Sequence, residues 1–127
     1  MATALFDTIL APITVTSNTE IVATLGARTL ILVTGAASFS FFGIAAVGGN
    51  VDGAVAVVLN ISNAVGVNFS FLNESSSASS PVNRFVNQGG SNVTTGLGVL
   101  GTGSGIGSTA YRYYGGSIQR WVAMSLT

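Results

Sequence analysis

The stretch AVAVVLNIS, residues 54–62, indicates the fold class because its side chains alternate with a period of two. Val55, Val57 and Leu59 share one side of an extended chain, and the residues between them share the other. A second alternation follows at once in VNFSFL, residues 67–72. Both stretches are typical of half-buried β-strands.

The same pattern extends in both directions along the chain. A strand is predicted over 39–47, and the GGNVDG stretch at 48–53 supplies a turn before the strand that starts at Ala54, so these two strands are expected to form a hairpin. The 17 glycines and the lack of an apolar helical stripe leave room for at most one helical turn, near Ala4 to Leu10. The remaining strand candidates are 12–17, 20–26, 28–34, 83–87, 92–100, 109–114 and 118–126.

About ten short strands at regular spacing predict an all-β protein, an antiparallel β-sandwich of the jelly-roll type. Its length of 127 residues suits a single domain over 1–127, in which residues 1–19 are a candidate extended N-terminal arm. Two segments are expected to be loops, the serine-rich Ser75 to Pro81 and the glycine-rich Gly96 to Gly107.

Charge is the most unusual feature of the composition. Only 6% of the residues are charged, four arginines and four acids with a net charge of zero, against about 25% in an average soluble domain. A free monomer is normally kept dispersed by surface charge, so the chain is expected to hide much of its surface in an oligomer or lattice. It also lacks the basic cluster that a nucleic-acid partner requires.

Enzymatic groups are scarce, and no enzyme activity or cofactor is expected. The sequence has no Cys and no His, which removes thiolate and imidazole metal ligands and leaves any serine nucleophile without a histidine base. The four acids, Asp7, Glu20, Asp52 and Glu74, leave open a carboxylate pair of the glycosidase type. The glycine-rich run at 96–107 is followed by no acidic residue, so a dinucleotide loop is not expected.

A membrane span is also not expected. Residues 29–51 carry no charge, but glycines and serines interrupt the run, and other uncharged stretches are equally long. The first residues lack a basic region and reach Pro12 before any long apolar run, so no secretion signal is predicted.

An aromatic group near the C-terminus allows two interpretations. Tyr111, Tyr113, Tyr114 and Trp121 could stack on sugars or single-stranded bases. Alternatively they belong to a C-terminal hairpin that turns at Gly115–Gly116, with the rings packed in the core or at a subunit contact. The second interpretation is preferred.

Two stretches, FSFLNESSSASSPVNRFVNQGG at 69–90 and YRYYGGSIQRW at 111–121, resemble a module of structural proteins in tailed bacteriophages. The resemblance is most specific where Asn-Glu-Ser ends a strand, where Asn-Arg-Phe follows the serine-rich loop, and at the final Arg-Trp. It implies an antiparallel β fold, usually a homotrimer, on a virion surface. The residues that carry it, and that are candidates for structural or interface roles, are Asn73, Glu74, Asn83, Arg84, Arg120 and Trp121.

These residues also have plausible physical roles. Glu74 and Arg84 flank the serine-rich loop, so an ion pair across its base is expected, with Asn73 and Asn83 capping turns. Trp121, in a C-terminal strand, is expected to be buried.

The resulting hypothesis is a virion structural protein, a capsid decoration (cement) protein that binds the outer capsid lattice as a homotrimer and stabilises the head. Its expected partners are further copies of itself and the major capsid protein or other virion proteins, in particles assembled in the bacterial cytoplasm. No long shaft segment of the kind that tail fibres need is visible in the 127 residues. The alternatives are a tail-fibre, head-fibre or spike receptor-binding module, a polysaccharide-cleaving spike, and a small membrane protein.

Overall fold

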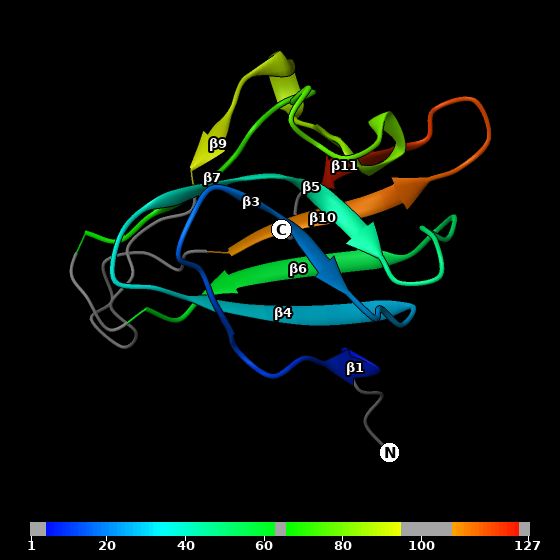
Figure 1. The fold of residues 1–127 in the computed structure, drawn as a ribbon. Helices are drawn as coiled ribbons and strands as arrows, with labels where there is room; N and C mark the ends of the chain where they lie inside the picture. The colour runs from blue at the N-terminus through cyan, green and yellow to red at the C-terminus, as the bar shows by residue number, and fades with distance from the viewer. Residues whose placement is uncertain (1–4, 63–65, 95–107, 125–127) are drawn as a thin grey trace.

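The structure, a computed structural model, describes residues 5–62, 66–94 and 108–124 and is almost entirely β (Figure 1). These ranges contain eleven strands, two short 3-10 helices and no α-helix. The helical turn expected near Leu10 is wrong, because Thr8 and Ile9 form a strand. The elements are β1 (Thr8–Ile9), β2 (Ile13–Thr14), β3 (Thr19–Ala23), β4 (Arg28–Thr34), β5 (Phe39–Ala46), β6 (Val55–Asn60), β7 (Phe69–Phe71), η1 (Pro81–Asn83), β8 (Phe85–Val86), η2 (Gln88–Gly90), β9 (Val93–Thr94), β10 (Ser108–Tyr114) and β11 (Arg120–Met124).

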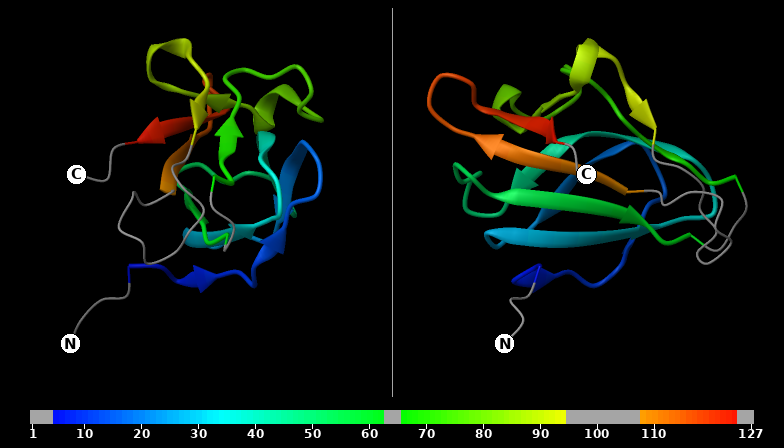
Figure 2. Two further views of the ribbon diagram at one scale, coloured as in Figure 1. Left: turned by 90° about the vertical axis from the view of Figure 1, so that its left-hand side faces the viewer. Right: turned by 180° about the vertical axis from the view of Figure 1, so that it is seen from behind.

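The strands form two sheets that face each other (Figure 2). The large sheet has seven strands in the order β1-β4-β6-β10-β11-β8, with β2 also paired to β4. The small sheet has four strands in the order β3-β5-β7-β9. Side chains from both sheets share one apolar core, which fits a two-layer sandwich.

Strand direction corrects the antiparallel prediction, because six of the nine ladders are parallel. From β3 to β9 the chain passes from one sheet to the other at every connection. Strands two places apart in this part of the chain therefore lie in the same sheet. Three of these pairs are parallel neighbours, in the ladders β3–β5, β5–β7 and β4–β6, whereas β7 and β9 are antiparallel. The jelly-roll topology, which is built of antiparallel Greek keys, is not confirmed.

The hairpin expected around 48–53 is also wrong, because β5 belongs to the small sheet and β6 to the large one. Hydrogen bonds from polar side chains fix this connection between the two sheets. The Asn50 side chain accepts from the Ala46 amide and donates to the Val82 carbonyl and to Asn83. Asp52 accepts the backbone N–H of Gly115, in the turn of another strand pair. The connection is thus tied to segments distant in sequence rather than closed on itself.

The C-terminal hairpin is present as predicted, with β10 and β11 antiparallel and Gly115–Gly116 in the turn. Its place in the sheet could not be read from the sequence. β10 pairs with β6 on one side, and β11 pairs with β8 on the other, so the hairpin fills the large sheet between two earlier strands.

Aromatic rings form the centre of the core. Phe41, Phe69, Phe71, Phe85 and Tyr111 are fully buried and lie in a chain of ring contacts, the shortest with centroids 4.4 Å apart between Phe85 and Tyr111. Tilted and edge-on contacts of this kind are the favoured arrangements of aromatic side chains. The small and large sheets are therefore joined mainly by aromatic packing.

The segment that precedes β3 lies along the large sheet. β1 and β2 both pair in parallel with β4, and Val15 is part of the core. The uncharged stretch 29–51 forms β4, β5 and part of the crossover, and the described ranges contain no helix long and apolar enough to cross a membrane. The glycine-rich segment 96–107 lies outside the described residues.

Candidate functional site

The three sequence patterns that carry the phage resemblance meet in space. The Glu74 amide donates to the Phe85 carbonyl, and the Trp121 amide donates to the carbonyl of Arg84, so three distant segments run side by side. Gly43 in β5 makes an isolated bridge with Arg84 here, and a Cβ at this glycine would collide with the Asn83 carbonyl. The cluster of these three segments therefore packs against the core at one side of the molecule.

The ion pair in the cluster differs from the prediction. Glu74 pairs with Arg120 rather than with Arg84, with 2.5 Å between Arg120 Nε and Glu74 Oε1. Phe85 in β8 and Trp121 in β11 are register partners, and both rings are buried. An arginine directly precedes each ring, Arg84 and Arg120 respectively. Since successive side chains of a strand point to opposite sides, both arginines leave the sheet on the side opposite the rings. Of the two, Arg120 contacts Glu74. The buried Arg84 Nε has no hydrogen-bond partner among the described residues.

The two candidate asparagines hold segments together. Asn73 accepts the Asn87 amide at 2.8 Å, and its own amide donates to Asn92. Asn83 donates to Ser79 and accepts from Asn50. Their side chains thus link the serine-rich loop to the β5–β6 crossover and to the η2 region.

The burial predicted for Trp121 is confirmed, since its side chain is fully buried and its Nε1 donates to the Ile44 carbonyl at 2.9 Å. Tyr111 and Tyr113 are buried beside it, and Tyr114 is the one ring of the four with substantial exposure, 39%. Burial raises the pKa of Tyr111 well above the usual value for tyrosine, and its hydroxyl donates to Asn87. The core interpretation of the aromatic group therefore holds for three of its four rings.

The four carboxylates are each engaged with a different part of the chain. Asp7 accepts from Thr8 and from the Arg28 amide, and Glu20 accepts the amide and hydroxyl of Ser79. Asp52 and Glu74 contact Gly115 and Arg120 as described above. Among the described residues no three acidic groups gather as a metal site would require.

The outer face of the large sheet is a surface that was not predicted from the sequence. Side chains at alternate positions of β4, β6, β10 and β11 enter the core, so those between them point outward. These outward residues, which we call the outer face, are Ile9, Arg28, Leu30, Leu32, Val55, Val57, Leu59, Ala110, Arg112, Tyr114, Arg120, Val122 and Met124.

The strand register orders the outer face into rows. One row is entirely apolar and runs Ile9, Leu30, Val57, Ala110, Met124 across five strands. The middle of the row is buried, with Val57 at 6% and Ala110 at 3% exposure, whereas Ile9 and Met124 at its two ends are 64% and 37% exposed. Sandwiches ordinarily present polar residues on this side, so an aliphatic row is unusual there.

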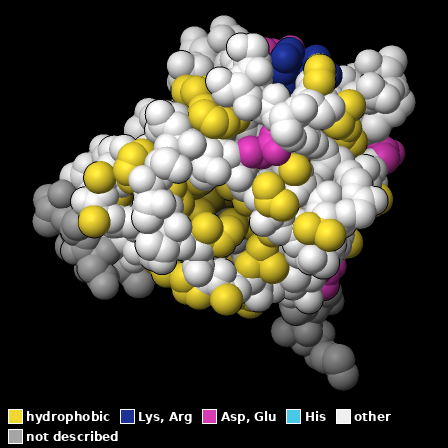
Figure 3. Space-filling view, in the orientation of Figure 1, with side chains coloured by type: hydrophobic (Ala, Val, Ile, Leu, Met, Phe, Trp, Pro, Cys, Tyr) yellow, Lys and Arg dark blue, Asp and Glu magenta, His cyan; other side chains and the backbone are white. Residues whose placement is uncertain are grey.

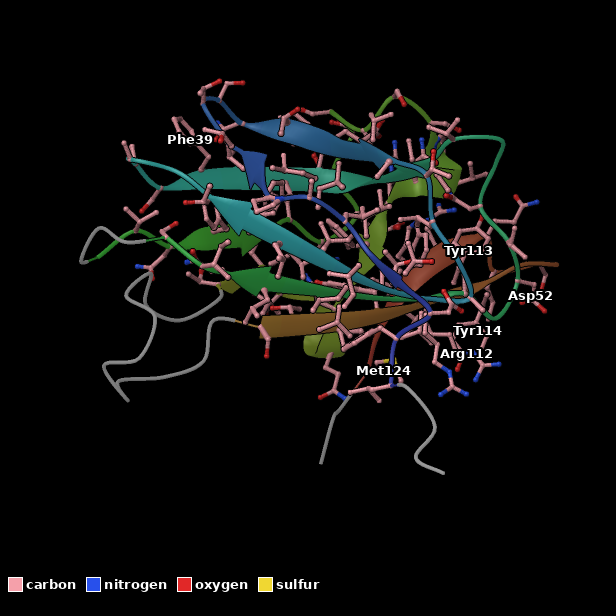
Figure 4. The ribbon with its side chains drawn as sticks, turned by 90° about the horizontal axis from the view of Figure 1, so that it is seen from below. Phe39, Asp52, Arg112, Tyr113, Tyr114 and Met124 are labelled. Atoms are coloured by element: carbon pink, nitrogen blue, oxygen red, sulfur yellow. The ribbon has the colours of Figure 1, made fainter. Side chains whose placement is uncertain are left out.

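The adjacent row contains two of the arginines of the face. Arg28 and Arg112 flank Val55, which is the register partner of each. Figure 4 shows Arg112 and Tyr114 side by side, with Met124 further along the same surface and Asp52 at the end of the molecule. The Arg112 guanidinium lies 5.3 Å from the centre of the Tyr114 ring, a cation–π distance.

The sequence did contain a signal for this face. In 54–59 both alternating sets are apolar, and the set with the larger side chains, Val55, Val57 and Leu59, is the one that points outward. Inside the sandwich, the small Ala56 leaves room for the aromatic rings. Alternation identifies the two sides of a strand, but it does not decide which of two apolar sides is the core.

A second apolar region lies beside β3, at an edge of the small sheet. A groove of about 280 Å³ is lined by residues 13–17 and by β3 side chains, with Phe41 below them. Figure 3 shows a hollow containing apolar side chains on this side of the molecule, with few charged atoms around it. Val22 in β3 is 62% exposed.

No protein-family model, curated protein or solved structure matches the chain. The functional proposal therefore rests on these surfaces and on the sequence patterns.

Proposed function

We propose that this chain is a virion structural protein of a tailed bacteriophage, a capsid decoration protein that binds the outer capsid lattice as a trimer and stabilises the head. The observation that carries the proposal is the outer face of the large sheet. It presents an aliphatic row across five strands in a chain with only eight charged residues. Such a surface suits permanent association better than a free monomer.

Self-association is part of the proposal and has its own candidate surface. Val22, Val47 and Val51 are each more than 60% exposed, and the groove beside β3 adds further apolar area at a sheet edge. An unpaired edge strand readily accepts a strand from another chain. Contacts made here would leave the outer face available for the capsid, and three copies would multiply weak contacts with the lattice by avidity.

A receptor-binding fibre or spike module is the alternative. It would need exposed aromatic rings for stacking on sugars, and Tyr114 is the candidate, because Tyr111, Tyr113 and Trp121 are buried. One partly exposed ring, already in contact with Arg112, gives this alternative less support than the outer face gives decoration.

Phage particles made with and without this chain test the proposal. A decoration protein acts by binding the assembled state, so its deletion should lower the temperature at which packaged genome is released, and added purified protein should restore it. Genome release is followed with a DNA-binding dye during heating, and attachment to host cells is measured on the same particles. A normal release temperature with lost attachment would favour the fibre alternative. If deletion changed neither property, both proposals would be wrong.

A further inference from the structure

The acidic side chains and the arginines of this chain differ in how many partners they have within the molecule. All four carboxylates accept hydrogen bonds within the molecule, three of them from backbone amides. Of the four arginines, Arg120 alone has a carboxylate within 4 Å in the part of the chain that the structure describes. The sequence has no net charge, but within the described residues three guanidinium groups have no carboxylate within 4 Å.

Two of these three lie together on the outer face. Arg28 and Arg112 are exposed and stand on either side of Val55 in one cross-strand row, which separates their Cα atoms by about 10 Å, two strand spacings. Asp7 accepts a hydrogen bond from the backbone amide of Arg28, and Asp52 accepts one from the backbone amide of Gly115. The aliphatic row runs directly beside the two arginines.

We propose that the outer face binds a protein surface that presents two carboxylates beside an apolar strip. Each guanidinium can take a carboxylate with two parallel hydrogen bonds, and the exposed residues at the ends of the apolar row, Ile9 and Met124, supply apolar area to be buried. This inference rests on the proposed decoration role and names the chemistry of the capsid surface that the protein recognises.

The charge inventory argues against a second copy as the occupant. A copy of this chain would bring one carboxylate with an oxygen that accepts no hydrogen bond among the described residues, Asp52, because Asp7, Glu20 and Glu74 already accept at both oxygens. Two outer faces placed together would also bring four like charges into contact, and like charges across an interface are unfavourable. The occupant is therefore a different, acidic protein.

The test uses surface plasmon resonance on mixed monolayers of carboxylate- and methyl-terminated alkanethiols, with methyl-only and ammonium-bearing monolayers as controls. The double variant Arg28→Gln, Arg112→Gln changes the net charge from 0 to −2. Its matched control, Ser76→Glu with Ser77→Glu, gives the same net charge in the exposed serine-rich loop. We expect wild type and control to bind the carboxylate–methyl surface in a salt-dependent manner, and the arginine variant to associate about tenfold more slowly.

Unfolding of each variant is checked by circular dichroism. If the glutamine variant did not fold, the double variant Arg28→Lys, Arg112→Lys would replace it. Lysine keeps the positive charge but cannot donate two parallel hydrogen bonds to one carboxylate, so this variant should bind several-fold more weakly than wild type. Equal binding by wild type and the arginine variant would overturn the inference. So would equal loss in the serine control, stronger binding to phosphatidylglycerol vesicles than to the carboxylate surface, or a change of oligomeric state in the arginine variant.

Binding to particles that lack the chain separates this inference from the proposed function. If wild type and the arginine variant restored particle stability equally, decoration would stand and the role of the two arginines would fail. If the monolayer result held but the protein did not bind particles, the decoration role would fail and the acidic partner would lie elsewhere.

Discussion

The inner side of the large sheet carries Tyr111, Tyr113 and Trp121, whereas the outer side of the same strands carries Ala110, Arg112 and Val122. Both sides are largely apolar, but the inner side is made of large rings whose buried polar atoms bond to protein groups such as the Ile44 carbonyl and Asn87. The outer side carries mainly aliphatic groups and arginines, of which Arg120 alone has a carboxylate within 4 Å among the described residues. The inner side thus satisfies its polar groups within the chain, whereas the outer side leaves aliphatic and charged groups for the contacts proposed above.

Trp121 gives the largest expected contrast between the two sides. Trp121→Ala removes a fully buried ring and the hydrogen bond to Ile44, and should lower the free energy of unfolding by about 3 to 5 kcal/mol. Met124→Ala on the outer side of the same strand should cost under about 1 kcal/mol, because Met124 is 37% exposed. Denaturant unfolding measures both, and equal costs would mean that the two sides are equally packed.

Asn87 tests whether the polar groups of the inner side matter. Its buried side chain accepts from Tyr111 and donates to the Phe71 carbonyl, so Asn87→Ala leaves both groups unpaired and should cost about 2 to 3 kcal/mol. Asn92→Ala, which removes an exposed bond to the Asn73 amide, is the matched control and should cost about 1 kcal/mol or less. In urea unfolding, Asn87→Ala should lower the free energy of unfolding more than Asn92→Ala does, and the reverse order would contradict this prediction.

Alkaline pH probes the same inner side through Tyr111. Burial raises the pKa of Tyr111 in the folded protein, so above about pH 10 the unfolded chain loses this proton while the folded chain keeps it. Stability should therefore be complete below that pH and fall as the pH rises beyond it. The thermal midpoint measured from pH 7 to 11 should drop less steeply in Tyr111→Phe, and identical profiles would contradict the assignment.

The Glu74–Arg120 pair should give the smallest effect. The side chains are 40% and 22% exposed, respectively, and exposed pairs contribute about 0 to 1 kcal/mol. A double-mutant cycle between Glu74→Gln and Arg120→Gln should show a small coupling, and a cycle with Arg84→Gln should show none. Coupling to Arg84 instead would restore the pairing that the sequence predicted.

Much of the secondary structure could be predicted from the sequence, because alternation is a local signal. The strands over 28–34, 39–46, 55–60 and 108–114 lie close to where the pattern places them. Pairing could not be predicted in the same way, since the GGNVDG stretch would suit a hairpin but crosses between sheets, held by Asn50 and Asp52. The partner of Glu74 was missed for a similar reason, because the contact with Arg120 depends on β8 and β11 being neighbours.

The position of β10 and β11 has a consequence for folding during synthesis. β6 and β8 are made well before the residues that must lie between them, so the large sheet stays open, with unpaired strand edges, until residues 108–124 have left the ribosome. Contacts between segments so distant in sequence form slowly, and exposed edges favour aggregation in the meantime. A chain with no lysine and few charges has little to counter this, so its production in cells should depend on chaperones and on the speed with which the last strand pair is inserted.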